Sequence, residues 1–280
     1  DAFMKPKFLG IGGQRCGTAW IYNCLDEHPS LCLPQKELNF FVHDEKYDQG
    51  TTWYENHFNS CGSATYAGEM SSLYLYDKRA PQRIYDFDPN LKLIASIRNP
   101  SDRTYSAYLN GIASGEIPRT KAFEDALNDF PDLLEKSAYS EGLERFKGIF
   151  NENLLILVYE EIVANPEKWF SAIYEFLEVD PNFSPTMARV EVNVGRKPKS
   201  TWVDQQFNNA GDLARALNLR KLLRWAKKVG IVSKLRNLNT QADNQSIPTE
   251  VYKKLNDYFA KDIENTSQIS GKPLTKIWLS

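Results

Sequence analysis

The sequence predicts an α/β protein in which a central parallel sheet is flanked by helices. Short apolar runs alternate with amphipathic segments through short connections, an order typical of parallel strands joined by helices. The runs are continuously apolar, as expected of strands that are buried on both faces. A glycine-rich turn joins the first strand to the first helix. We expect residues 1–280 to form a single domain, with a core of about 6–200 and a C-terminal helical extension of about 211–280.

The first half of the chain contains three of the expected strands. Apolar residues predict strands over Phe8–Gly12, Tyr66–Glu69 and Leu91–Ile97. Helices are expected over Thr18–Asp26 and Pro81–Phe87.

A long helix follows the Leu91–Ile97 strand. Asn99 is a good N-cap and Pro100 suits the first helical turn, so the helix is expected to run to about Ala113. Further along, the expected elements are the amphipathic segment Tyr139–Phe150, the strand Leu154–Val158 and the helix Pro166–Leu177.

The strand–helix pattern breaks after residue 180. Asp180 to about Asn209 is polar and is expected to be a loop. A basic amphipathic helix is predicted over Leu213–Val229, a loop over Thr240–Pro248 and a last helix over Thr249–Ile263.

Composition narrows the class of protein and its partners. The formal charge of −2 gives no reason to expect general affinity for nucleic acid, and no apolar run is long enough to span a bilayer. The four cysteines (Cys16, Cys24, Cys32 and Cys61) lack C-x-x-C spacing, which favours reduced thiols and a cytoplasmic location. Together with the three histidines they are too scattered to indicate a metal site.

The segment Leu9–Trp20 predicts an anion site. Gly12 and Gly17 have the spacing of a phosphate-binding loop, and Thr18 opens a helix whose N-terminal amides can face an anion. The lysine expected after the second glycine is absent, and the cation lies inside the loop as Arg15.

A second anion site is predicted where the Leu91–Ile97 strand ends. Arg98 stands at the carboxyl end of the strand, where ligands of open parallel sheets bind. Ser106 lies two turns into the following helix, and the two side chains could hold a phosphate together. Arg103, one turn before Ser106, is expected to be a solvated helix residue.

These two motifs, in this order, resemble the PAPS-dependent sulfotransferase superfamily (PAPS, 3′-phosphoadenosine 5′-phosphosulfate). The motif pattern is similar to that of heparan-sulfate-type and bacterial sulfotransferases, which have a P-loop-like nucleotide-binding fold. Three further segments carry the resemblance: Lys36–Phe41, Gly68–Tyr74 and Val194–Pro198.

The resemblance implies a set of donor-binding residues. Arg15, Gly17 and Thr18 would hold the 5′-phosphosulfate, with backbone amides of Cys16 and Ala19. Arg98 and Ser106 would bind the 3′-phosphate. A late loop would close over the nucleotide through Gly195, Arg196 and Lys197. PAPS is then the donor and PAP the product, with no metal required.

Glu37 is the residue that the resemblance assigns as general base. Sulfuryl transfer needs the acceptor hydroxyl to lose its proton as it attacks sulfur, and a carboxylate can take that proton. Phe40 and Phe41 would make its setting partly desolvated. The rival bases are His43 and His57, neither of which lies in a matching motif.

The leaving group needs a cation, and here the sequence departs from its relatives. Heparan-sulfate-type enzymes have a lysine where this chain has Met70. A methionine side chain cannot supply the positive charge that the leaving group needs. Arg15 or Lys36 could replace it, and Glu69 could orient a cation or the acceptor.

Other functions remain open at this level. A carbohydrate hydroxyl is the favoured acceptor; an amine, a hydroxylated lipid and an acyl chain on a carrier protein are alternatives. A P-loop kinase or NTPase would explain the Gly12 and Gly17 spacing, with Thr18 on magnesium, but lacks the lysine. A non-catalytic anion-binding module would use the basic helix Leu213–Val229, and oligomeric state is not predicted.

Overall fold

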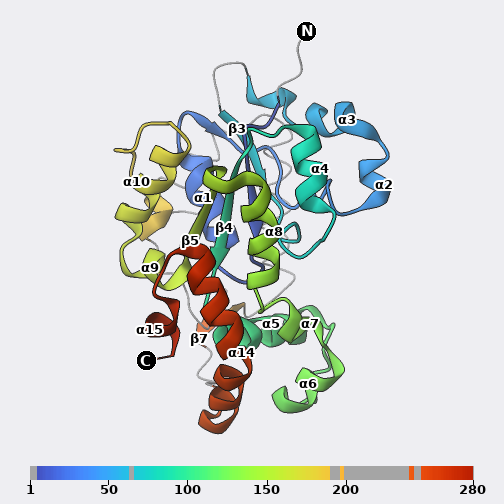
Figure 1. Ribbon diagram of the computed structural model, residues 1–280, viewed down its shortest axis with the longest axis vertical. Coiled ribbons are helices and arrows are strands. Elements are labelled where there is room, and N and C mark those ends of the chain that lie inside the picture. Colours follow the sequence, from blue (N-terminus) through green and yellow to red (C-terminus); the bar gives the residue numbers. More distant parts are fainter. Residues whose placement is uncertain (1–4, 63–65, 190–195, 199–239, 243–246, 280) are drawn as a thin grey trace.

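Five parallel strands form the central sheet of the computed structural model, which describes residues 5–62, 66–189, 196–198, 240–242 and 247–279 (Figure 1). The spatial order of the strands is β2-β3-β1-β4-β5, and each neighbouring pair is parallel. Their bounds are β1 (Phe8–Gly12), β2 (Leu31–Cys32), β3 (Tyr66–Met70), β4 (Lys92–Ile97) and β5 (Leu154–Val158). The predicted fold class is therefore confirmed.

Helices cover both faces of the sheet. The helices that precede β5 in the chain are α1 (Thr18–Glu27), α2 (Asp44–Tyr47), α3 (Gly50–Asn56), α4 (Ala80–Phe87), α5 (Pro100–Ser114), α6 (Phe123–Asp129), α7 (Asp132–Glu135) and α8 (Ser140–Phe150). Those after β5 are α9 (Tyr159–Ala164), α10 (Pro166–Phe176), α14 (Thr249–Ser270) and α15 (Leu274–Trp278). None of the helices in these ranges combines the length and apolarity that crossing a membrane requires.

Alternation along the strands divides the core into two layers. Leu9 and Leu93 point toward a cluster that includes residues of α4, α8 and α14, whereas Phe8 and Ile94 point toward one that includes residues of α1 and α10. Figure 1 shows these two groups of helices on opposite sides of the sheet. Strands buried on both faces must be apolar at every position, which is why these strands could be predicted from continuous apolar runs in the sequence.

The chain reverses its direction of travel across the sheet at β1. It forms β2 and β3 on one side of β1 and then β4 and β5 on the other. The loop after β1 and the loop after β4 therefore flank a topological switch point, where ligands of such sheets bind.

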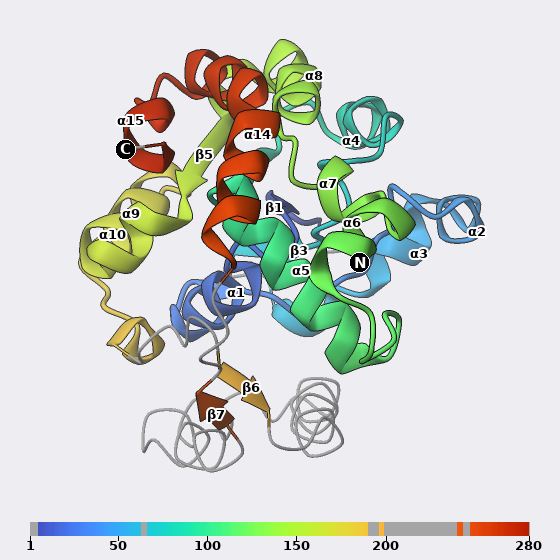
Figure 2. The ribbon, with the colours of Figure 1, turned by 90° about the horizontal axis from the view of Figure 1, so that it is seen from below.

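Helix α14 packs against α5, and α15 reaches Asn99, the residue before α5 (Figure 2). The Asn99 side chain accepts a hydrogen bond from Ser101 N (2.9 Å), which caps α5, and its amide group donates to Trp278 O (3.1 Å) and to the Tyr252 hydroxyl (3.2 Å). Glu160 accepts from Asn99 N (2.8 Å) and from Trp278 Nε1 (3.0 Å). The end of the chain is thus bonded directly to the loop that carries Arg98.

The fold corrects expectations about two loops and about the cysteines. Neither Asp180–Asn209 nor Thr240–Pro248 is a loop throughout, because β6 (Arg196–Pro198) pairs antiparallel with β7 (Thr240–Ala242). The prediction of reduced cysteines fails for Cys32 and Cys61, which form a disulfide; the fold brings their Cα atoms to 5.6 Å, within the range for a bridge. The basic helix predicted over Leu213–Val229 lies outside the described residues.

Candidate active site

A tight turn at the carboxyl end of β1 presents the start of α1. Gly17, the N-cap, has φ 80°, a left-handed conformation that costs glycine little, and a Cβ there would lie 2.8 Å from the Tyr159 ring. The first amides of α1, those of Thr18 and Ala19, belong to the N-terminal turn that intrahelical bonds leave open. This end of α1 has the geometry of an anion site.

Arg103 on α5 holds this turn in place. The side chain is 1% exposed, and it donates to Gln14 O (3.0 Å), Leu133 O (3.1 Å) and the Ser137 hydroxyl (3.2 Å). The expectation of a solvated helix residue is therefore wrong. Its partners come from distant segments, so the sequence carried no local signal of this role.

The turn is also tied to the sheet and to α8. The Ser96 hydroxyl donates to Cys16 O (2.6 Å), and the Cys16 thiol lies 3.4 Å from the Tyr139 hydroxyl. Burial raises the pKa of Cys16, so its side chain stays a thiol and serves packing.

The structure brings the two predicted anion elements together. Arg15 donates through Nε to the Ser106 hydroxyl (3.3 Å) and through Nη1 to Asn110 Oδ1 (3.1 Å), both on α5. The Arg98 guanidinium lies 5.1 Å from the centre of the Tyr159 ring, the same ring that closes against Gly17. Asn110 was not identified from the sequence, although it lies one turn after Ser106.

Positive charge is concentrated at this point. Burial, followed by the guanidinium groups of Arg98 and Arg103, lowers the pKa of Arg15. Three like charges placed this close are unfavourable without an anion. The arrangement therefore favours a ligand that carries several negative charges.

Glu37 lies on the segment beside the carboxyl end of β3. Its carboxylate accepts from Ser72 N (3.0 Å) and from the Ser72 hydroxyl (2.9 Å), while its own amide donates to Met70 O (2.9 Å). Ser72 O is in turn 3.0 Å from the position of a Cβ on Gly12. Ser72 therefore links the Glu37 carboxylate to the glycine-rich turn.

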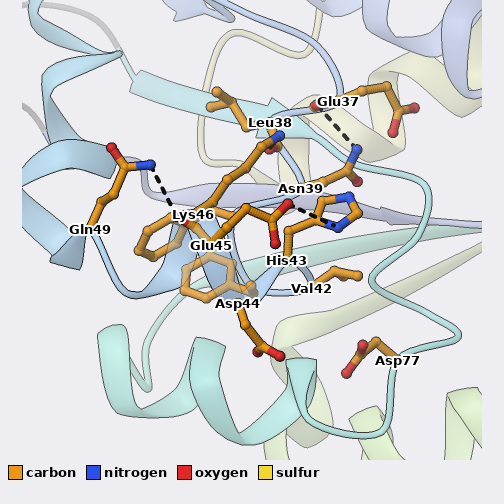
Figure 3. A network of polar contacts seen from close by, with 12 residues as sticks. Glu37, Leu38, Asn39, Val42, His43, Asp44, Glu45, Lys46, Gln49 and Asp77 are labelled. Atoms are coloured by element: carbon orange, nitrogen blue, oxygen red, sulfur yellow. Dashed lines mark hydrogen bonds and ion pairs between the residues drawn. The ribbon is translucent and has the colours of Figure 1, made fainter.

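The rival bases have other contacts. Figure 3 shows the segment from Glu37 to Lys46, in which His43 Nδ1 lies 3.8 Å from a carboxylate oxygen of Glu45. Lys46 Nζ donates to Leu38 O (2.7 Å) in the same segment. His57 Nδ1 lies 3.0 Å from Trp53 O.

Glu69 is enclosed at the end of β3. The residue is 0% exposed, and the partners that the structure describes for its carboxylate are the hydroxyls of Tyr54, Ser71 and Tyr74. In this conformation its carboxylate is enclosed by protein groups, and its catalytic role stays a prediction. Met70 is 2% exposed and packs in the core, where a Cβ on Gly10 would collide with its side chain.

For four of the predicted site residues the structure gives few details or none. Lys36 is half-buried and pairs with Met70 through a parallel bridge. Arg196 and Lys197 lie in β6, of which only the backbone is described, and Gly195 lies outside the described residues. Within the part of the chain that is described, no group of three or more His, Cys, Asp or Glu side chains could hold a metal ion.

Comparison with known proteins identifies the family. The family model of the sulfotransferase domain matches residues 5–210, which is most of the chain. The chain belongs to the sulfotransferase family, as the motif resemblance predicted.

Relatives and a solved structure agree with this assignment. The human heparan sulfate glucosamine 3-O-sulfotransferase 5 is 27% identical over 192 residues, covering 64% of this chain and 55% of that protein. The mouse bifunctional heparan sulfate N-deacetylase/N-sulfotransferase 4 is 31% identical over 201 residues, covering 64% of this chain and 23% of that protein. The chain thus spans about half or less of the length of these curated relatives.

The fold likeness extends along the whole chain. The crystal structure of a sulfotransferase from Alicyclobacillus acidocaldarius superposes with a TM-score of 0.72 at 19% identity, covering 99% of this chain and 100% of that one. At this identity the likeness speaks for the fold.

Proposed function

We propose that this domain transfers a sulfuryl group from PAPS to a hydroxyl of a carbohydrate acceptor, with Glu37 as general base. One observation carries the proposal: Ser72 binds the Glu37 carboxylate through two hydrogen bonds, and its carbonyl oxygen would lie 3.0 Å from a Cβ on Gly12 of the anion-binding turn. A candidate base and a candidate phosphosulfate site are therefore neighbours. Family membership supplies the reaction class.

The donor site would be formed by the turn after β1 and the loop after β4. Arg15 and the N-terminal amides of α1 would hold the phosphosulfate, and Arg98 with Ser106 would bind the 3′-phosphate. The clustered guanidinium groups support a ligand with several negative charges: burial, followed by Arg98 and Arg103, lowers the pKa of Arg15.

Glu37 would act on the acceptor. The acceptor oxygen attacks sulfur, its proton passes to the Glu37 carboxylate, and the bond from sulfur to the bridging phosphate oxygen breaks to release PAP. Negative charge then grows on that bridging oxygen. Because Met70 is held in the core, Arg15 is the cation we assign to this charge.

The acceptor class follows from the names of the relatives. One acts on heparan sulfate glucosamine at oxygen and another is an N-sulfotransferase, so a sugar hydroxyl is favoured and an amine is the alternative. A hydroxylated lipid or a carrier-tethered acyl chain is the second acceptor class to be tested.

The proposal is tested with radiolabelled PAPS and three probes: heparan sulfate, de-N-sulfated heparan sulfate and a 3-hydroxy fatty acid, each with EDTA present. Label should enter heparan sulfate, and Glu37→Gln should lower turnover by roughly 10²- to 10⁴-fold while PAP still binds.

Arg98→Ala should instead weaken PAP binding, measured by calorimetry. Full turnover in Glu37→Gln would eliminate this base, and label in the fatty acid alone would replace the carbohydrate assignment.

A further inference from the structure

The buried carboxylate of Glu69 receives three hydroxyl groups. Tyr54 (3.1 Å) and Tyr74 (2.5 Å) donate to Oε1, and Ser71 (2.6 Å) donates to Oε2. The proposed reaction gives this carboxylate no task. Burying a carboxylate nevertheless costs free energy, because the group loses its hydration and needs hydrogen-bond donors from the protein to replace it.

Two of these hydroxyls also bind the segment that carries Glu37. The Ser71 hydroxyl accepts from Asn39 N (2.8 Å), and the Tyr74 hydroxyl accepts from Phe40 N (3.1 Å). Two consecutive backbone amides, beginning two residues after Glu37, are therefore connected to Glu69 through one hydroxyl each. In the described part of the chain, the Tyr54 hydroxyl has Glu69 as its hydrogen-bond partner.

Above its pKa of about 7, where Glu69 is ionised, its charge sets the direction of both connections. A hydroxyl has one proton to donate, and an ionised carboxylate can only accept it. Once the proton of Ser71 or Tyr74 points to Glu69, its oxygen lone pairs are open to a backbone N–H. Hydrogen bonds aligned in this way strengthen one another in a buried setting.

The segment needs such support because its backbone is unusual. Glu37 has φ 55° and Asn39 has φ 52°, both in the left-handed region that residues other than glycine rarely adopt. Such conformations persist where surrounding contacts determine them. The hydrogen bonds to Asn39 N and Phe40 N lie at the end of this stretch.

We propose that Glu69 is a positioning residue: through the hydroxyls of Ser71 and Tyr74 it fixes the backbone that aims the Glu37 carboxylate. The inference rests on the proposed role of Glu37 as base. It gives a task to a carboxylate that is buried beside the site.

The ionisable groups around Glu69 are consistent with this role. Burial raises the pKa of Glu69 to about 7; the hydroxyls of Ser71, Tyr74 and Tyr54 oppose this rise and the Glu37 carboxylate adds to it, so the carboxylate is ionised above about pH 7. Burial and the Glu69 charge hold the pKa values of Tyr54, on α3, and Tyr74 well above their usual range, so both hydroxyls keep their protons.

Two tyrosine variants of the whole chain separate positioning from simple packing. Tyr74→Phe and Tyr54→Phe each remove one hydroxyl from the same fully buried carboxylate, but only Tyr74 binds Phe40 N. Residue-resolved hydrogen exchange at pH 8, where Glu69 is ionised, should show the Phe40 amide exchanging about tenfold faster in Tyr74→Phe, and within about twofold of wild type in Tyr54→Phe. Ser71→Ala should speed exchange of the Asn39 amide in the same way, and it decides the matter alone if Tyr74→Phe does not fold.

Equal changes in the two tyrosine variants, or an unchanged Phe40 amide in Tyr74→Phe, overturn the inference. Turnover with PAPS and heparan sulfate adds a second readout, in which Tyr74→Phe lowers kcat while the Kd for PAP stays at the wild-type value. The exchange result does not depend on the reaction. Full turnover in Glu37→Gln therefore refutes the base, whereas unaltered exchange refutes the positioning role.

Discussion

The buried carboxyl group of Glu69 makes the stability of this protein depend on pH. Its pKa is raised by burial to about 7, compared with the ordinary value of 4.5 expected in the unfolded chain. Glu69→Gln keeps the shape of the side chain and removes the titration. Comparing the two proteins isolates this one group, because the other titrating groups are common to both.

The sign follows from which state holds the proton. Below about pH 4.5 the carboxyl group is protonated in both states, and between 4.5 and 7 the unfolded chain releases a proton that the folded protein retains. Stability is therefore lost as the pH rises through this window and is constant above it. The two pKa values differ by about 2.5, and at about 1.36 kcal/mol for each pH unit the loss is roughly 3 kcal/mol.

Urea unfolding of wild type and Glu69→Gln at pH 5, 6, 7 and 8 measures this loss. The free energy of unfolding of wild type should fall relative to the variant by about 2.5 kcal/mol over the series, with most of the change before pH 7. A difference between the two proteins that is the same at every pH would refute the reasoning, since it would mean that Glu69 has the same pKa in both states.

Two further substitutions test the supports of the donor site. Arg103→Lys cannot reproduce the forked contacts of the guanidinium group to Gln14 O and Gln14 Oε1. We therefore expect a loss of about 3 kcal/mol in unfolding free energy and weaker PAP binding by calorimetry. Unchanged PAP affinity would contradict the role of this arginine. Asn99→Ala removes both a helix cap and the donor to Trp278 O, so urea unfolding should show a loss of about 2–3 kcal/mol. Asn165→Ala, which removes a cap that accepts from Lys168 N, is the matched control and should cost about 1 kcal/mol; equal losses would show that the Trp278 contact contributes nothing.

Local patterns predicted the sheet because they reflect local physics. The bounds of β1 and β5 match the expected strands, since a strand buried on both faces must be apolar throughout and its ends are marked by polar residues or glycine. Asn99 and Pro100 likewise allowed the start of α5 to be predicted, because one caps the helix and the other suits its first turn.

Tertiary contacts explain what the sequence did not reveal. Arg103 reads as a surface residue in its own helix, and only the fold surrounds it with Gln14, Leu133 and Ser137. The disulfide was missed for the same reason, because Cys32 and Cys61 are 29 residues apart and become neighbours once β2 is in place. The roles of Glu37 and Arg98 stay predictions, although the structure places each beside the turn after β1.

The contact between Asn99 and Trp278 has a consequence for synthesis of the chain. The two residues are separated by 179 positions, so the loop that carries Arg98 gains these partners only after α15 has left the ribosome. Until then Asn99 has its cap but lacks Trp278 and Tyr252. A nascent chain should therefore acquire its nucleotide affinity late, after its sheet has formed.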